Sequence, residues 1–234
     1  MLEAECRALI EDFEKWVTRG LPFVWLKLAV SLDGRIATAS GDSRWVTGEA
    51  ARRRVHEMRN RLDAILVGSG TVLADDPKLT CRLARGRDPV RVILDGRLRV
   101  PERARALAAS GAAVRLYTRG KATAKAKRLR RRGVIVRPGG GDRCGAFRRI
   151  LEDLAAAGIK SVLVEGGATI AARALREGLV DRVSVFVAPR FVGGDGQPAV
   201  GPLGIRRMRD TFPLVDVHVE RLGDDVLVEG RPLP

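Results

Sequence analysis

Several residue types that carry chemistry or mark a compartment are scarce in this chain of 234 residues. Aromatic residues make up 4% of it, so it lacks the basic and stacking side chains that alternate in single-strand nucleic-acid binders. The chain has two histidines, His56 and His218. This number excludes a His-rich metal site and leaves few candidates for the histidine of a hydrolase triad. Three widely separated cysteines without a Cys-x-x-Cys pair argue against a disulfide scaffold and predict a reduced, cytoplasmic protein.

Long apolar runs are also missing. None reaches the roughly 18 residues that a membrane-spanning helix needs. The N-terminal segment MLEAECRALIEDFEKW is acidic and has no apolar h-region, so it does not read as a signal peptide. We therefore expect no membrane association.

The formal net charge of +15 makes nucleic acid the first partner to consider. Arginine is spread over the whole chain, however, and the densest cluster, KATAKAKRLRRRG at 121–133, has the spacing of a solvated helix face. With so few aromatic residues, the composition argues against nucleic-acid binding. A positive field that attracts phosphate is the alternative interpretation.

The order of the apolar patterns predicts an α/β fold. A stripe of apolar residues at helical period predicts an N-terminal amphipathic helix that ends near Gly20. Strand-like runs then alternate with helical patterns, which predicts a mostly parallel sheet with helices on both faces. The tail alternates apolar and polar residues around Gly223-Asp224, as an antiparallel hairpin does. We expect a connector helix over residues 1–20 and a single domain over 21–234.

The expected boundaries follow from these patterns. Strands are predicted at 23–30, 64–68, 90–95, 113–118, 134–136, 161–166 and 182–189, and helices at 49–61, 121–132, 146–157 and 168–177.

Ligands of open α/β sheets bind at the carboxyl ends of the parallel strands, and three strand ends are chemically marked. The first is VGSGTVLADDP at 67–77, which lacks the third glycine of a dinucleotide fingerprint and is a weak Rossmann signal. It is either an ordinary strand-to-helix turn or a turn whose backbone N–H groups approach a ligand, with Thr71 and Asp75 as polar contacts.

The second marked end is EGGATIAARAL, where Glu165 ends an apolar strand and Gly166-Gly167 opens a helix. Exposed N–H groups at such a helix start form an anion site suited to a pyrophosphate. Glycines placed for tight packing are the alternative. That reading leaves Glu165 without a partner or a task, which is costly at the end of a buried strand.

The third marked end is PFVWLKLAVSLDG at 22–34. Strand alternation puts Val24 and Leu26 on one face of the sheet and Trp25 and Lys27 on the other. An unpaired ammonium is costly in such an apolar run, so Lys27 either snorkels to the sheet edge or pairs with Glu165. The turn that follows carries Asp33, a candidate for substrate contact or for structural support.

The helix predicted at 49–61 brings basic side chains to this region. Thr47 is its expected N-cap, and Arg52, His56 and Arg59 flank its buried stripe. Solvated arginine is the default reading. Arg59 becomes a stronger candidate for a phosphate contact if Arg82, which follows DDPKLTC, is a second contact to the same phosphate.

Three motifs resemble the reductase domain of the bifunctional riboflavin-biosynthesis deaminase/reductase: LKLAVSLDGRIATASGDSRWVT, GSGTVLADDPKLTCR and VLVEGGAT. The similarity runs from about Leu21 to the C-terminus, and FEKWVTRGLPFV resembles the connector after the deaminase domain. The resemblance implies a dihydrofolate-reductase-like three-layer sandwich. It also implies NADPH-dependent reduction of the ribosyl side chain of 5-amino-6-(5-phosphoribosylamino)uracil to a ribityl chain, and a homodimer built on the C-terminal strands.

The resemblance assigns site residues by position. Contacts to NADPH are implied for Ala29, Trp45, Thr71, Asp75, Gly166, Gly167, Ala168, Thr169 and Ile170. Contacts to the substrate and its 5′-phosphate are implied for Ser43, Arg59, Leu79, Arg82 and Glu165. From charge alone, Thr118 and Arg119 at a strand end are candidates for the 2′-phosphate of NADPH. Glu165, Lys27 and Asp33 are the candidate catalytic residues, the first two to orient the pyrimidine and the opened sugar.

The sequence departs from the bifunctional pattern in one respect. A zinc deaminase needs His-x-Glu and Pro-Cys-x-x-Cys motifs, and the chain has neither. We therefore expect a stand-alone reductase, a separated fragment or a relative with another substrate, with a separate deaminase as a candidate partner. The alternatives are a folate or pterin reductase on the same fold, the earlier diamino form of the pyrimidine as substrate, and a nucleic-acid-binding protein with an inactive reductase fold.

Overall fold

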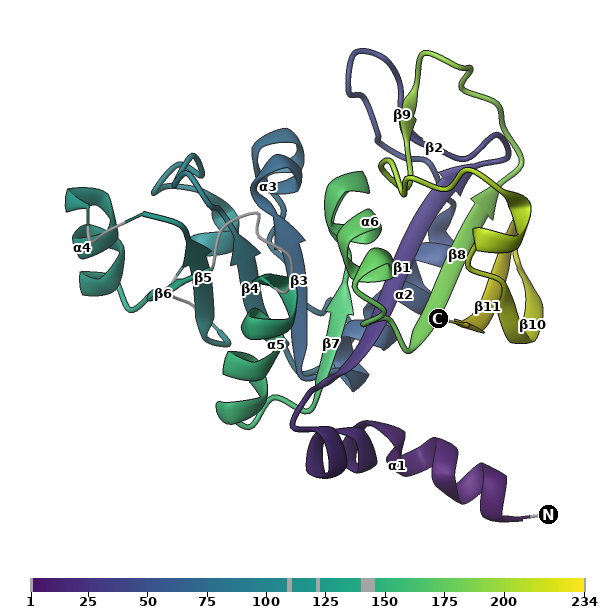
Figure 1. Cartoon of the computed structure of the whole chain (residues 1–234). Coiled ribbons are helices and arrows are strands. Elements are labelled where there is room, and N and C mark those ends of the chain that lie inside the picture. The colour runs from purple at the N-terminus through teal and green to yellow at the C-terminus, as the bar shows by residue number, and fades with distance from the viewer. Residues whose placement is uncertain (1, 109–110, 121–122, 140–145, 234) are drawn as a thin grey trace.

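The computed structural model describes residues 2–108, 111–120, 123–139 and 146–233, without the side chains of residues 2–8. Its centre is a nine-stranded sheet in the order β10-β11-β8-β1-β7-β3-β4-β5-β6 (Figure 1). The strands from β8 to β6 are parallel, and β11 and β10 continue the sheet antiparallel. The predicted mostly parallel sheet with a C-terminal hairpin is confirmed.

The element boundaries lie close to the predicted ones. The main sheet consists of β1 (Phe23–Ser31), β3 (Ala64–Gly68), β4 (Val90–Leu94), β5 (Val114–Thr118), β6 (Ile135–Pro138), β7 (Ser161–Val164), β8 (Arg182–Ala188), β10 (Leu214–Leu222) and β11 (Asp225–Pro232). The helices are α1 (Leu2–Arg19), α2 (Glu49–Arg61), α3 (Ser69–Asp75), α4 (Ala124–Arg131), α5 (Ala146–Ala156) and α6 (Ala168–Arg176), with 3-10 turns η1 (Arg105–Leu107) and η2 (Met208–Asp210). The sequence did not predict α3 or the small sheet of β2 (Arg35–Ala37) and β9 (Gln197–Pro198).

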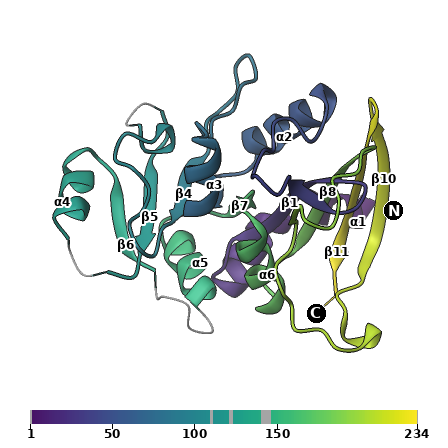
Figure 2. The ribbon, with the colours of Figure 1, turned by 90° about the horizontal axis from the view of Figure 1, so that it is seen from above.

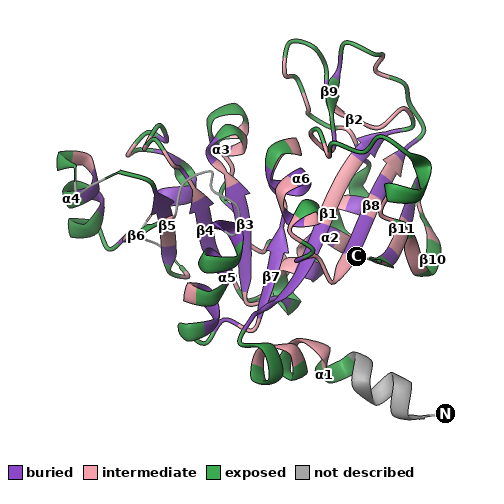
Figure 3. Ribbon diagram, viewed as in Figure 1, coloured by how far each residue is buried: buried purple, intermediate pink, exposed green. Residues whose placement is uncertain are grey.

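Helices cover both faces of the sheet, which makes the predicted three layers (Figure 2). On one face, α5 and α6 pack on side chains such as Leu26 and Leu66. On the other, α2 packs on Trp25, and α3 and α4 pack on Ile65 and its neighbours. The alternation of Trp25 with Leu26, and of Ile65 with Leu66, follows from the strand period of two. Figure 3 shows the central strands largely buried between these layers.

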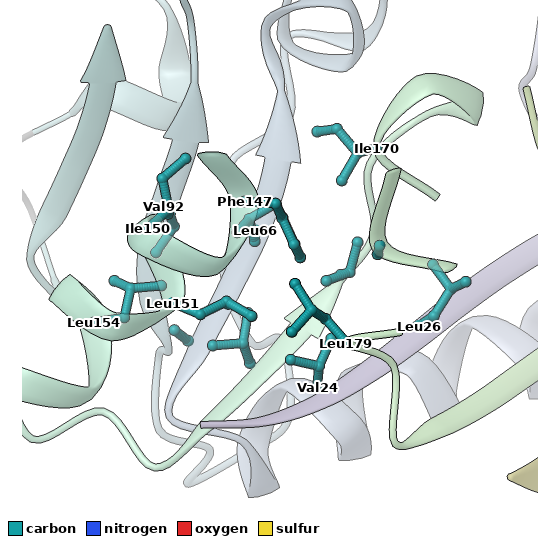
Figure 4. Close-up of a cluster of buried hydrophobic side chains, with 14 of the residues drawn as sticks. Val24, Leu26, Leu66, Val92, Phe147, Ile150, Leu151, Leu154, Ile170 and Leu179 are labelled. Atoms are coloured by element: carbon teal, nitrogen blue, oxygen red, sulfur yellow. The ribbon is translucent and has the colours of Figure 1, made fainter. Parts of the chain in front are cut away.

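The core on the α5–α6 face runs across the strands from β8 to β5. Val24 of β1, Leu66 of β3 and Val92 of β4 are fully buried in one cluster with Phe147 of α5 (Figure 4). Removing this much apolar surface from water fixes the carboxyl ends of the strands in place. Those ends carry the three chemically marked turns.

The N-terminal helix α1 lies at the bottom of the view in Figure 1. Lys15 pairs with Asp181, Glu11 pairs with Arg182, and the Trp16 indole donates to the Ala155 carbonyl. The described part of its apolar stripe is exposed, with Leu9 77% and Val17 59% accessible. Within the described ranges, no helix has both the length and the apolar character needed to cross a membrane.

The start of α2 differs from the prediction. Thr47 does not cap the helix: Gly48 is the N-cap and makes no side-chain cap bond. Instead, the Asp225 carboxylate from the start of β11 accepts the Gly48 N–H at 2.7 Å. Asp225 is 3% exposed, so a residue 177 positions away in sequence binds the backbone N–H of the N-cap residue, a bond that a capping box takes from the helix's own third residue.

This contact gives a stability prediction. Replacing Asp225 by alanine should destabilise the protein by about 1–2 kcal/mol, since it removes a charge-assisted bond at a helix start and leaves the Gly48 N–H unpaired. Urea denaturation measures the change. The matched control is Asp224→Ala, next to it in sequence but exposed. Equal effects of the two substitutions would contradict the capping role.

Candidate active site

A buried cluster of charges lies at the carboxyl end of β7, beside the middle of its neighbour β1. Glu165 follows β7 directly, and its Oε2 lies 3.8 Å from Lys27 Nζ on β1. Arg59 of α2 donates to the same carboxylate twice, Nε to Oε1 at 2.7 Å and Nη2 to Oε2 at 2.9 Å. The three side chains are 8%, 16% and 14% exposed. Of the two readings of Lys27, the pair with Glu165 is the one present, and Arg59 completes the cluster.

Their environment sets the charge states of the carboxyl and the amine. Burial acts to raise the pKa of Glu165, but the Arg59 guanidinium and the Lys27 ammonium outweigh it, so the pKa lies below its usual value. Burial lowers the pKa of Lys27, against the attraction of Glu165. Glu165 therefore stays ionised at neutral pH, and Lys27 gives up its proton more readily than a surface lysine.

Arg59 still has hydrogen-bonding capacity for a ligand. A guanidinium has five N–H donors. Two are used on Glu165, and a third, on Nη1, donates to the Thr80 carbonyl at 3.1 Å. One hydrogen on each of Nη1 and Nη2 is not used in these bonds. Arg82 lies two residues after Thr80 and is exposed.

Two other predicted substrate contacts have defined surroundings. Ser43 Oγ donates to Asp75 at 3.2 Å, which joins a predicted substrate residue to a predicted cofactor residue. The Leu79 side chain is 3% exposed and packs in the core beneath α3. Its φ is +57°, and because its side chain is buried, only its backbone is available to a ligand.

Asp33 has a structural task. Its carboxylate accepts the Ser31 hydroxyl at 2.6 Å and the backbone N–H groups of Gly193 and Val192 at 2.7 and 3.1 Å. The bonds from Ser31 and Gly193 lower the pKa of Asp33 to about 2. These contacts tie the turn after β1 to the loop after β8. Of the two roles considered for Asp33, the geometry favours structural support over catalysis.

The two glycine corners lie against each other. A Cβ on Gly166 would lie 3.0 Å from the Gly68 nitrogen and 3.1 Å from Val67 Cα, closer than side chains pack. Gly167 is the N-cap of α6 and makes no side-chain cap bond, while its own N–H points to Thr71 Oγ1 at 3.3 Å. The sequence therefore needs glycine here for close backbone approach, and the start of α6 keeps N–H groups available for an anion.

A cavity of about 350 Å³ opens beside this corner, over the ends of β3, β4 and β5. Predicted cofactor residues Thr118, Arg119, Thr169 and Ile170 line it. Arg119 lies across Gly96, where a Cβ would come within 2.8 Å of its Nε. Sequence reasoning missed three further arginines at the rim: Arg97, Arg99 and Arg173. Arg97 and Arg99 follow β4, and their position at a strand end was the available signal.

The other predicted cofactor residues lie outside this cavity lining. Ala29 is two residues beyond Lys27 on β1. Trp45 is 59% exposed, and the Arg52 guanidinium lies 4.8 Å from its ring centre. Ala168 opens α6. The site thus has two parts, the charge cluster at β1 and β7 and the cavity at β3–β5, with the glycine corner between them.

Comparison with known proteins identifies relatives of the whole fold. The sequence family described as the RibD C-terminal domain matches residues 22–228. A protein of Aquifex aeolicus named riboflavin biosynthesis protein RibD is 38% identical over 227 residues, 97% of this chain and 62% of that protein. A protein of Methanothermobacter thermautotrophicus named 2,5-diamino-6-ribosylamino-4(3H)-pyrimidinone 5′-phosphate reductase is 41% identical over 212 residues, 89% of this chain and 97% of that protein.

Solved structures agree. The Thermotoga maritima diaminohydroxyphosphoribosylaminopyrimidine deaminase/5-amino-6-(5-phosphoribosylamino)uracil reductase is 36% identical with a TM-score of 0.84, covering 99% of this chain and 62% of that one. Acinetobacter baumannii RibD is 32% identical with a TM-score of 0.86, at 99% and 64% coverage. The chain thus spans under two thirds of the Aquifex, Thermotoga and Acinetobacter proteins. The predicted fold and the resemblance to the reductase domain are confirmed.

Proposed function

The chain belongs to the RibD C-terminal domain family, a family of riboflavin-biosynthesis reductases, and we propose that it reduces the ribosyl side chain of 5-amino-6-(5-phosphoribosylamino)uracil to the ribityl form with NADPH. The observation that carries the proposal is the buried Lys27–Glu165–Arg59 cluster beside a glycine corner. It sets a proton donor and an ionised carboxylate next to a place for an anionic cofactor.

The residues present fit NADPH. The uncapped start of α6 and the close approach of Gly68 and Gly166 suit a pyrophosphate. The arginine-rimmed cavity next to them suits an adenosine with a further phosphate. When bound, NADPH supplies the hydride for C1′ of the ribose.

The chain's own groups handle orientation and the proton. Reduction of the ring-opened imine adds a hydride to C1′ and a proton to the attached nitrogen. The Lys27 ammonium, whose pKa burial lowers, is suited to supply that proton. Glu165 is ionised and held by Arg59 in one geometry, so it can accept hydrogen bonds from sugar hydroxyls or from the pyrimidine. Catalysis here is positioning and electrostatics.

The substrate phosphate is assigned to Arg59 and Arg82, and Ser43 is assigned to the substrate. Arg59 offers the two N–H groups that Glu165 and Thr80 leave, and Arg82 offers an exposed guanidinium. A folate or pterin reductase needs a carboxylate for the ring but no such pair. Comparing turnover of the phosphoribosylaminopyrimidine with that of dihydrofolate separates the two, and faster turnover of dihydrofolate would refute the proposal.

Cofactor choice should favour NADPH over NADH by about tenfold or more in kcat/KM. The reason is the extra phosphate, which Arg119 at the end of β5 meets with charge-assisted hydrogen bonds. Steady-state kinetics with both cofactors measures the preference, and Arg119→Ala should narrow it. Equal efficiency with the two cofactors would contradict the assignment.

A homodimer is also proposed. The edge strand β10 exposes Val217 and Val219, which are 53% and 58% accessible, and a long edge with apolar side chains invites pairing. Light scattering at micromolar concentration should give twice the chain mass. Val219→Lys, a charge on that edge, should shift the mass toward the monomer. A monomeric wild type would overturn the proposal.

Two finer points stay predictions. The Thermotoga relative is named a deaminase as well as a reductase, so a separate deaminase is a candidate partner of this chain. The cytoplasmic location rests on cysteine usage, and a relative from Arabidopsis thaliana is named chloroplastic.

A further inference from the structure

His56 lies between the two arginines assigned to the substrate phosphate. It precedes Arg59 by one helical turn on α2 and is half-buried. Its Nδ1 accepts the backbone N–H of Arg82 at 3.3 Å. No role described above involves this imidazole.

The bond from Arg82 belongs to a set that holds one short segment against α2. The Thr80 carbonyl accepts from Arg59 at 3.1 Å. The Cys81 thiol lies 3.5 Å from the His56 carbonyl, and the Arg82 N–H reaches the His56 ring. Three consecutive residues of the segment thus contact α2, two of them through His56. The imidazole is the contact that fixes the backbone of Arg82 itself.

The Arg82 side chain extends from this anchor and is exposed. A long exposed side chain has many rotamers, and ordering it on a ligand costs entropy. That cost rises if the backbone that carries the side chain is also free to move. A fixed backbone at Arg82 therefore improves phosphate binding without touching the phosphate.

The charge state of His56 suits this task. Burial, and then the neighbouring Arg59 and Arg82, lower its pKa, while Glu165 and the Thr80 backbone oppose the shift. The ring is therefore neutral at neutral pH. Only a neutral ring has the Nδ1 lone pair that accepts the Arg82 N–H.

We propose that His56 is a positioning residue of the phosphate site, whose neutral imidazole holds the Arg82 backbone so that its guanidinium and Arg59 meet one phosphate. The inference rests on the proposed function, because it takes Arg82 as a phosphate contact. It adds a residue that acts on the substrate only through Arg82.

The test compares His56→Ala with His56→Asn, whose amide oxygen can take the place of Nδ1. His56→Ala should raise the KM for the phosphorylated substrate about five- to tenfold, the worth of one hydrogen bond, with kcat within about twofold. The KM for the dephosphorylated analogue should not change. His56→Asn should recover most of the loss, and His218→Ala, on the edge strand β10 and exposed, should behave as wild type.

Three results would overturn the inference: a wild-type KM in His56→Ala, an equal loss on both substrates, or no recovery in His56→Asn. The last would mean that the ring acts other than as an acceptor. Calorimetric binding of ribose 5-phosphate by the wild type and the same variants separates this failure from failure of the proposed function. If the wild type binds ribose 5-phosphate but reduces no pyrimidine phosphate, the proposed function fails, and the ranking of the variants still decides the role of His56.

Discussion

Replacing Glu165 by glutamine should lower turnover by about 10²- to 10³-fold, the range seen when one preorganised electrostatic group is removed from an active site. Glutamine keeps the shape of the side chain but removes the charge that Arg59 and Lys27 share. The dissociation constant of NADPH should change little, because the proposed cofactor site is the Gly166-Gly167 backbone and the cavity beside it. The substitution therefore separates chemistry from cofactor binding.

Single-turnover kinetics and NADPH fluorescence titration measure the two quantities. The matched control is Glu102→Gln, since Glu102 also accepts Nε and Nη2 of an arginine, Arg128, but at the surface. The control should retain wild-type turnover. Thermal unfolding of both variants shows whether the protein stays folded, because removing one partner of a buried ion pair destabilises. Wild-type turnover in Glu165→Gln would reduce Glu165 to a structural residue.

Replacing Arg82 by alanine should weaken binding of the phosphorylated substrate by about ten- to a hundredfold, the worth of one or two charge-assisted hydrogen bonds. The dephosphorylated analogue should be almost unaffected, because Arg82 is exposed and assigned only to the phosphate. Arg82→Lys keeps the charge but not the planar fork, so it should recover only part of the loss. If the analogue loses as much as the phosphate ester, Arg82 does not bind the phosphate.

Arg59 calls for a different expectation from Arg82. On sequence alone, both arginines were expected to act on the phosphate only. The structure places the Arg59 guanidinium on Glu165, so Arg59→Ala should impair the dephosphorylated analogue as well, and the phosphorylated substrate more. Steady-state kinetics of the two alanine variants on the two substrates measures this contrast.

The sequence predicted what depends on strand order and alternation. The parallel sheet and the marked ends of β3 and β7 follow from apolar runs that end on a charge or a glycine, and the Lys27–Glu165 pair was one of two readings of Lys27. A carboxylate and an ammonium on neighbouring buried strands are expected to pair, because either charge alone is costly to bury. These features of the site could therefore be predicted from the sequence alone. The approach of the two glycine corners to each other was not predicted.

Contacts that loops and helices make with residues far away in sequence could not be predicted from these patterns. Arg59 looks like any solvated arginine on a helix, and only the crossing of α2 under the sheet brings it to Glu165. Thr47 satisfies the local rule for an N-cap, yet Asp225 from the C-terminal hairpin binds the helix start. In the sequence, Asp33 resembles an active-site carboxylate, but in the structure it accepts the backbone N–H groups of residues 192–193. In each case tertiary geometry outweighs local preference.

We propose that this chain reduces a phosphoribosylaminopyrimidine with NADPH. The most direct test of this proposal is NADPH oxidation with the deaminated and the diamino pyrimidine 5′-phosphates as substrates, with mass spectrometry of the product. We expect NADPH consumption with at least one of them and a product heavier by two hydrogens that carries a ribityl chain. Consumption with neither, while dihydrofolate is reduced or no substrate is turned over, would contradict the account.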